Sequence, residues 1–217
     1  MNPHDIVAAV NAPLLQVAGT PVSWAEAAGF VTGAWCVWLV AREHIANWPM
    51  GIANNVFFAV LFWAAGLYAD AGLQGVYLAL GAYGWWVWLR GGGRGALEVS
   101  RTPIREWRAL AVLGVAGTAG LTLLLGHVTD SSVPFWDALT TSLSLLATYG
   151  QCRKRLESWW LWIAADVIYV PLYAYKQLYL TAGLYAVFLA LCVAGLLSWR
   201  SSLRRRGVLI TGLSVPA

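Results

Sequence analysis

The sequence contains few charged residues. Aspartate, glutamate, lysine and arginine together make up 11% of its 217 residues, whereas soluble domains carry about a quarter. Hydrophobic residues make up 59% of the chain, and the mean hydropathy is +0.63. This composition excludes an ordinary soluble domain and predicts an integral membrane protein.

Cysteine and histidine are also scarce, with three of each. The cysteines lie in or beside apolar stretches without a C-x-x-C spacing, so they predict no disulfide framework. The histidines lie in the N-terminal segment or between apolar stretches: His4, His44 and His127. No metal-ligand spacing and no nucleophile–base pair follow from them. The sequence therefore predicts no cofactor, no metal site and no enzyme activity.

Basic residues are absent before Arg42, so the first segment lacks the basic region of a signal peptide. Residues 1–21 are interpreted as a short N-terminal surface segment. The sequence pI is about 9.1, yet the basic residues are confined to short joins between apolar stretches. That pattern is typical of membrane orientation, and it argues against a nucleic-acid partner.

Seven apolar stretches have about the length needed to cross a lipid bilayer. They are Val22–Ala41, Trp48–Gly66, Ala71–Leu89, Trp107–Gly126, Pro134–Gln151, Trp159–Tyr175 and Leu180–Trp199. Seven crossings place 13 of the 14 lysines and arginines on one side, with Lys176 as the exception. By the positive-inside rule the N-terminus is outside and the C-terminus is cytoplasmic.

The chain contains an internal repeat at an offset of 111 residues. The offset aligns Glu26 with Asp137, Arg42 with Arg153, Trp48 with Trp159, Gly84 with Gly195 and Trp88 with Trp199. Paired Trp, Arg and Gly over three apolar stretches predict two three-helix units in parallel orientation, joined by a linker helix. The predicted parts are residues 22–90, a loop and linker helix at 91–132, residues 133–200 and a cytoplasmic tail at 201–217.

One carboxylate lies inside an aromatic stretch. On a helix, Trp162, Asp166, Tyr169 and Tyr173 share one face. An acid at membrane depth predicts a functional site that faces a cavity, and the alternative is a hydrogen bond between helices that only fixes packing. The repeat partner of Asp166 is Asn55, which supports the cavity interpretation.

Other side chains join this candidate site through the repeat or through stripes on the third and seventh stretches. The candidate substrate-binding residues are Trp48, Asn54, Asn55, Gln74, Tyr77, Trp85, Trp159, Trp162, Asp166, Tyr169, Tyr173 and Tyr185. Aromatic rings around an acid favour a flat, positively charged ring compound. The fifth stretch carries hydroxyls such as those of Thr140 and Thr148. They could contact the ligand, but hydrogen bonds to carbonyls of their own helix are an equally good interpretation.

Several motifs resemble the PnuC family of bacterial nicotinamide riboside transporters. They include Pro134-Phe135-Trp136-Asp137, Trp159-x-x-Trp162-x-x-x-Asp166 and Trp48-x-x-Gly51-x-x-Asn54, and the resemblance extends from Val22 to Trp199. It implies an all-α, 3+1+3 fold related to the SWEET sugar transporters, in a bacterial cytoplasmic membrane. It also implies a homotrimer, a substrate between the repeats, and facilitated diffusion made one-way by cytoplasmic phosphorylation.

The chain departs from the family at Asp166, where Asn is frequent. Nicotinamide riboside and thiamine are both cationic aromatics, so the carboxylate does not separate them, while neutral riboflavin gains least from it. The hypothesis is a vitamin transporter, with nicotinamide riboside first and thiamine or riboflavin as alternatives. A non-transporting membrane subunit that binds a protein partner through its basic loop and tail is the rival, and an enzyme is the weakest third.

Overall fold

The computed structural model describes residues 12–17, 20–64, 66–91, 96–128, 133–175, 177 and 179–212. Over these residues the chain forms seven helices and one short hairpin. The helices are α2 (Trp24–Ala41), α3 (Asn47–Ala64), α4 (Tyr68–Arg90), α5 (Ile104–Val128), α6 (Pro134–Cys152), α7 (Ser158–Tyr175) and α8 (Tyr179–Gly212). Each corresponds to one of the apolar stretches, so the prediction of an all-α protein with seven long helices is confirmed. Lys176, used in the charge count, lies outside the described residues.

Two segments differ from the sequence-based expectation. An antiparallel hairpin of β1 (Pro13–Val17) and β2 (Thr20–Ser23) lies where only a surface segment was expected. Its β-branched Val17, Thr20 and Val22 favour extended backbone over a helix. At the other end, α8 continues to Gly212, through the predicted boundary at residue 200. Leu203 packs against the buried core and extends the apolar face of this helix.

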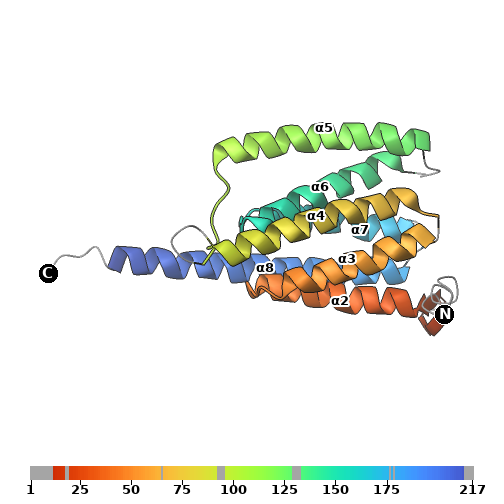
Figure 1. Ribbon diagram of the computed structural model, residues 1–217, viewed down its shortest axis with the longest axis horizontal. Helices are drawn as coiled ribbons and strands as arrows, with labels where there is room; N and C mark the ends of the chain where they lie inside the picture. The colour runs from red at the N-terminus through yellow and green to blue at the C-terminus, as the bar shows by residue number, and fades with distance from the viewer. Residues whose placement is uncertain are drawn as a thin grey trace.

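The helices pack as two groups with α5 at one edge (Figure 1). Within the groups, α2 contacts α3, α3 contacts α4, α6 contacts α7, and α7 contacts α8. Two further contacts join the groups, α2 with α8 and α4 with α6, while α5 packs along α6. The joins α2–α3, α4–α5 and α6–α7 lie at the end from which α8 projects, here called the basic end.

Membrane-spanning length and composition are clearest in two helices among the described residues. They are Ile104–His127 in α5 and Tyr179–Arg205 in α8. Helices α2, α3 and α7 have 18 residues each, which is at the short end of the range for a helix that crosses a bilayer.

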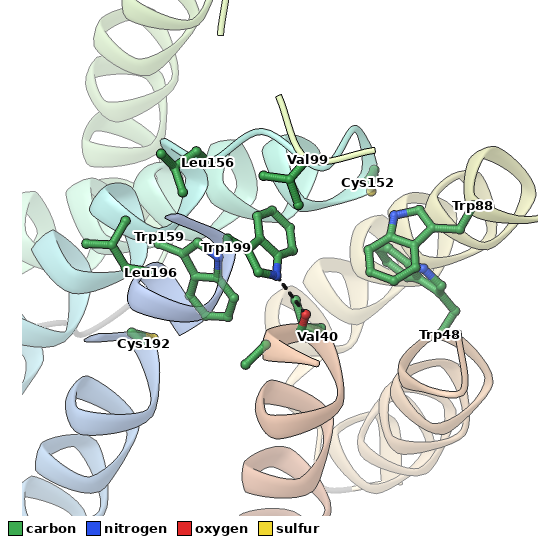
Figure 2. Close-up of a cluster of buried hydrophobic side chains, with 11 residues drawn as sticks. Val40, Trp48, Trp88, Val99, Cys152, Leu156, Trp159, Cys192, Leu196 and Trp199 are labelled. Atoms are coloured by element: carbon green, nitrogen blue, oxygen red, sulfur yellow. Dashed lines mark hydrogen bonds between the residues drawn. The ribbon is translucent and has the colours of Figure 1, made fainter. Parts of the chain in front are cut away.

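Core contacts recur at positions separated by the repeat offset of 111 residues. The rings of Trp48 and Trp88 meet edge to face at 5.5 Å, and those of Trp159 and Trp199 at 5.4 Å. The Trp88 indole donates a hydrogen bond to the Gln151 carbonyl at 3.2 Å. Correspondingly, the Trp199 indole donates to the Val40 carbonyl at 3.0 Å. Each indole therefore links one group of helices to the other, and Figure 2 shows the bond from Trp199 to Val40.

These tryptophans belong to a buried cluster near the basic end. Val99, from the segment between α4 and α5, is 3% exposed and packs into the same cluster. Figure 2 shows it between the Trp88–Trp48 pair and the Trp159–Trp199 pair. The α4–α5 segment is therefore part of the core at this end.

Candidate functional site

A cavity of about 420 Å³ lies between the two groups of helices. Its wall is built from α2, α3, α4, α6, α7 and α8, and no residue of α5 lines it. Small-molecule sites occupy about 300–1,000 Å³ in proteins. The volume therefore suits a compact ligand of vitamin size.

Most of the predicted binding residues line this cavity. They are Trp48, Asn54, Asn55, Gln74, Tyr77, Trp159, Trp162, Asp166 and Tyr185. The tryptophans and Asp166 enter from α3 and α7, whose positions correspond through the repeat. Asn55 and Asp166, 111 residues apart, line the same space, as the sequence analysis expected of a cavity between repeats.

Three of the predicted residues do not line the cavity. Trp85 is 37% exposed. Its neighbour Gly84 is buried instead, because Gly84 faces the Trp48 ring and Trp85 is turned about 100° away on the helix. Tyr169 and Tyr173 stack against each other, and their ring centres lie 4.5 and 5.0 Å from that of Tyr185. They support the wall from behind Tyr185.

Asp166 is the acidic side chain of the cavity. The residue is 2% exposed, and its Oδ2 has no hydrogen-bond partner among the described residues. A buried polar atom without a partner is costly and normally pairs with water or a ligand. The carboxylate is therefore available to a positively charged or hydrogen-bond-donating ligand.

Three indole N–H groups in the wall have the same property. The Nε1 atoms of Trp48, Trp159 and Trp162 are buried and lack a partner within the described part of the chain. An indole can only donate, so these groups require acceptor atoms. Together with Asp166, the residues of the wall therefore carry three buried donors and one buried acceptor without a partner among the described residues.

Two tryptophans of the wall are held by close contact with glycines. A Cβ built on Gly84 would overlap the Trp48 ring, and one on Gly195 would overlap the Trp159 ring. Because Trp88 and Trp199 contact the same rings edge to face, each ring is fixed from two sides. The two aromatic walls are therefore preorganised rather than mobile.

The amides and hydroxyls of the cavity are partly used within the protein. The Asn54 amide donates to the Thr32 hydroxyl, and the Asn47 amide donates to the His44 carbonyl at 2.8 Å. Thr140 and Thr148 donate to carbonyls of their own helix at 2.9 and 2.8 Å, which confirms that sequence interpretation. Thr148 nevertheless lines the cavity.

Several lining residues were not among the predicted binding residues. Asn47, Gln151, Phe58, Phe188 and Cys192 all contribute to the wall. Asn47 and Gln151 lie at helix ends beside charged joins. Polar residues are common in such places, so their presence there does not indicate a binding site. Phe188 is the repeat partner of Tyr77, and this correspondence was a signal that could have identified it.

The cavity contains no arrangement typical of a metal centre. No group of three or more His, Cys, Asp or Glu side chains is suitably placed within the described ranges. The chemistry offered is aromatic stacking, one carboxylate and several amides and N–H donors. Such a set suits the binding of a flat aromatic ligand.

Comparisons with known proteins agree with this arrangement. A family model described as nicotinamide mononucleotide transporter matches residues 23–201. The chain is 27% identical over 215 residues to the nicotinamide riboside transporter PnuC of Escherichia coli, covering 87% of this chain and 90% of that protein. It is also 27% identical over 188 residues to the riboflavin/roseoflavin transporter RibM of Streptomyces davaonensis, covering 85% and 88%.

A solved structure shares the fold. The crystal structure of the vitamin B3 transporter PnuC superposes with a TM-score of 0.65 at 24% identity, covering 84% of this chain and 83% of that chain.

Proposed function

Because this chain belongs to the nicotinamide mononucleotide transporter family, whose members are multi-pass membrane transporters and not enzymes, we propose that it carries a cationic vitamin into a bacterial cell. Nicotinamide riboside is the first candidate. Uptake runs by facilitated diffusion through the central cavity, and phosphorylation in the cytoplasm prevents return. The working unit is a homotrimer in the cytoplasmic membrane, which a measurement of mass in detergent tests directly.

We further propose that the transporter works by alternating access between two related three-helix units. The units are α2–α4 and α6–α8, and α5 is the linker that lets both run in the same direction. The repeated indole contacts at an offset of 111 residues support this arrangement. The basic end faces the cytoplasm by the positive-inside rule.

The observation that carries the substrate assignment is the unpartnered Oδ2 of the Asp166 carboxylate in the wall of an aromatic cavity. Trp48, Trp159 and Trp162 enclose the ring of the vitamin, and Asp166 balances its positive charge. Asn55 and Gln74 bind hydroxyl or amide groups. Nicotinamide riboside has a pyridinium cation, a carboxamide that donates and accepts, and ribose hydroxyls, and these groups complement the unsatisfied donors and acceptor.

Riboflavin and thiamine are the alternatives. The similarity to the riboflavin/roseoflavin transporter RibM equals that to PnuC in percentage identity. Riboflavin is neutral, however, so it leaves the carboxylate without a compensating charge, which is costly in a buried site. Thiamine is cationic and satisfies Asp166 as well as nicotinamide riboside does.

Calorimetric titration of the purified protein with the three vitamins tests the assignment. We expect saturable binding of nicotinamide riboside and weaker or no binding of neutral riboflavin, while thiamine is the cationic competitor that the titration compares directly. Binding of thiamine or riboflavin alone would move the chain to that substrate with the same fold. Folded protein that binds none of them would favour the rival, a membrane subunit that binds a protein partner.

Trp162→Phe tests the role of the unpaired indole N–H groups. Phenylalanine keeps an aromatic ring but removes the donor, so we expect the dissociation constant to rise about fivefold, as for one net hydrogen bond. Trp160→Phe is the matched control. Trp160 lies in the same helix, α7, but it is 47% exposed and does not line the cavity. Equal effects of both changes would contradict the proposed contact.

A further inference from the structure

The turns that follow α2 and α6 meet at the basic end. Glu43 and Lys154, 111 residues apart, form an ion pair with 2.9 Å between the carboxylate oxygen and Nζ. Both residues have left-handed backbone, with φ of 54° and 48°. The two turns therefore have similar shapes and present opposite charges to each other.

The ion pair is shielded from water and connected to the cavity wall. The Lys154 side chain is 8% exposed and that of Glu43 is 21% exposed. Lys154 Nζ also lies over the Trp88 ring, 4.3 Å from its centre. Trp88 in turn contacts Trp48, which lines the cavity. Two ring contacts thus connect Lys154 to the cavity wall.

Residues 97–102, here called the strap, cross this end of the bundle. The strap is fastened to the α6–α7 turn by two backbone hydrogen bonds, from Ser100 to the Lys154 carbonyl at 3.0 Å and from Leu156 to the Ser100 carbonyl at 2.9 Å. Glu157 accepts bonds from the backbone N–H and the hydroxyl of Thr102, both at 2.8 Å. Val99 fills the space between the tryptophan pairs.

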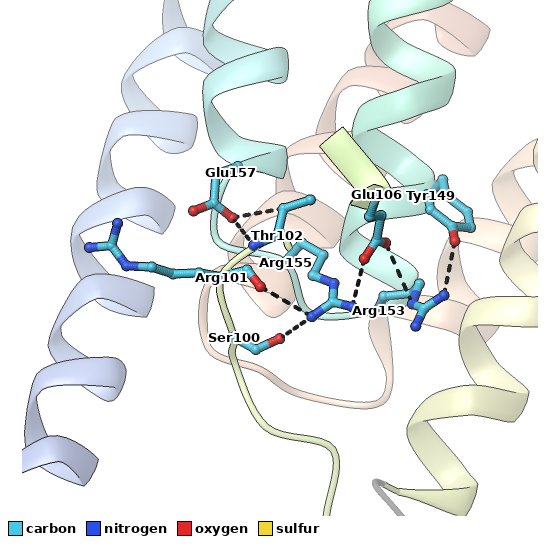
Figure 3. A network of polar contacts seen from close by, with 8 residues as sticks. All are labelled: Ser100, Arg101, Thr102, Glu106, Tyr149, Arg153, Arg155 and Glu157. Atoms are coloured by element: carbon cyan, nitrogen blue, oxygen red, sulfur yellow. Dashed lines mark hydrogen bonds and ion pairs between the residues drawn. The ribbon is translucent and has the colours of Figure 1, made fainter. Parts of the chain in front are cut away.

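A second set of polar contacts holds the start of α5 at the same place (Figure 3). Arg155 donates to the Ser100 hydroxyl at 2.8 Å and pairs with Glu106 at 2.7 Å. Arg153 pairs with the same carboxylate group at 3.7 Å. The strap is therefore held to the α6–α7 turn by the residues that follow Val99.

We propose that the Glu43–Lys154 ion pair and the strap form the cytoplasmic gate of the transport path, closed in this structure. This inference rests on the proposed function, because a gate has meaning only if the cavity is a transport path. An ion pair suits a gate that must open, since both charges regain hydration when they separate into water. Removing one partner instead leaves the other charge buried and uncompensated, which destabilises the closed arrangement.

Access to Cys36 tests the gate without any vitamin. Cys36 lines the cavity, and it serves as the reporter when Cys152 and Cys192 are replaced by alanine in every version of the protein. The rate of its reaction with a small, charged methanethiosulfonate reagent is measured in inverted vesicles, which expose the cytoplasmic face, and in right-side-out vesicles. The variants are Lys154→Gln, Glu43→Gln and the swapped pair Glu43→Lys/Lys154→Glu.

We expect Lys154→Gln and Glu43→Gln to accelerate the reaction about tenfold or more in inverted vesicles, because loss of one partner disfavours the closed gate. Right-side-out vesicles show no such change, and the swapped pair restores slow labelling. Arg42→Gln is the matched control. Arg42 precedes Glu43 and is exposed, with its guanidinium over Trp38.

Unchanged labelling in inverted vesicles, an equal increase from both faces, or failure of the swap to restore slow labelling would overturn the gate. Loss of folded protein in both single variants would assign the pair to stability alone and overturn it too. Failure of the vitamin titration with a positive labelling result would instead reject the proposed substrates and leave the gate intact.

Discussion

Asp166→Asn is expected to raise the dissociation constant for the cationic vitamin about 10- to 100-fold, the loss that follows removal of one charge-assisted hydrogen bond. The Asp166 carboxylate lies in the cavity wall with Oδ2 unpaired. Asparagine has nearly the same shape and still offers an acceptor oxygen, so the change removes the charge and little else. Calorimetric titration of both proteins measures the effect.

The same substitution is expected to leave the thermal stability unchanged or to increase it. Burying an ionised carboxylate without a partner destabilises a fold, and the neutral amide removes that cost. Weaker binding combined with equal or greater stability distinguishes a ligand contact from a packing contact between helices. A melting curve recorded by the fluorescence of the tryptophans checks it.

Asp70→Asn provides the matched control for this prediction. Asp70 is exposed, lies in the first turn of α4 and does not line the cavity. We expect its affinity for the vitamin to match that of the unchanged protein. If Asp166→Asn bound the vitamin normally, or if it bound weakly only because the protein had lost stability, the charge-balancing role would be rejected.

The comparison also separates the candidate vitamins. A neutral ligand such as riboflavin gains no charge balance from Asp166, so removal of the charge should leave its affinity equal or improved. A cationic ligand loses affinity. The sign of the change therefore reports the charge of the bound vitamin.

Gly195→Ala is the second change for which we expect a large effect. The added Cβ would overlap the Trp159 ring, and Trp159 is fully buried and in edge contact with Trp199 on its other side. The ring must therefore move, at a cost of about 1–3 kcal/mol in the free energy of unfolding. Because Trp159 lines the cavity, we also expect vitamin binding to weaken at least tenfold, about 1.4 kcal/mol.

Gly183→Ala is the control in the same helix. No side chain or neighbouring backbone lies within 4 Å of a Cβ at Gly183, so alanine should be accepted and should stabilise the helix by about 0.5–1 kcal/mol. The parallel pair in the first unit is Gly84→Ala, which meets the Trp48 ring, and Gly75→Ala, which meets nothing within 4 Å.

Measurements of unfolding and of vitamin titration on all four glycine variants check the prediction. Equal behaviour of Gly195→Ala and Gly183→Ala would mean that the Trp159 ring yields freely. It would remove the argument that the aromatic walls are preorganised.

Much of the fold follows from local properties of the sequence. Length and hydropathy predict the seven helices, because a segment that crosses a bilayer must be apolar and must satisfy its backbone hydrogen bonds internally. The charged residues between the apolar stretches predict where the helices end. The hairpin before α2 and the extension of α8 to Gly212 were missed, since neither depends on membrane thickness.

Two criteria together predicted residues of the candidate site: correspondence through the repeat, and a position on the same helical face as other candidates. Trp48, Trp159, Asn55 and Asp166 were found in this way, and all line the cavity. Trp85 was predicted from helical periodicity and does not line the cavity. Helical periodicity specifies which residues share a face, but the direction of that face depends on how neighbouring helices pack.

The sequence by itself determined the membrane class, the seven helices, the internal repeat and the aromatic face that contains Asp166. These properties depend on composition and on spacing along one helix. Only the tertiary structure decided that Glu43 meets Lys154, that Val99 enters the core, and that Trp88 and Trp199 bond across the two groups. Those contacts join residues far apart in the chain, and their geometry depends on the relative positions of packed helices, which no local pattern contains.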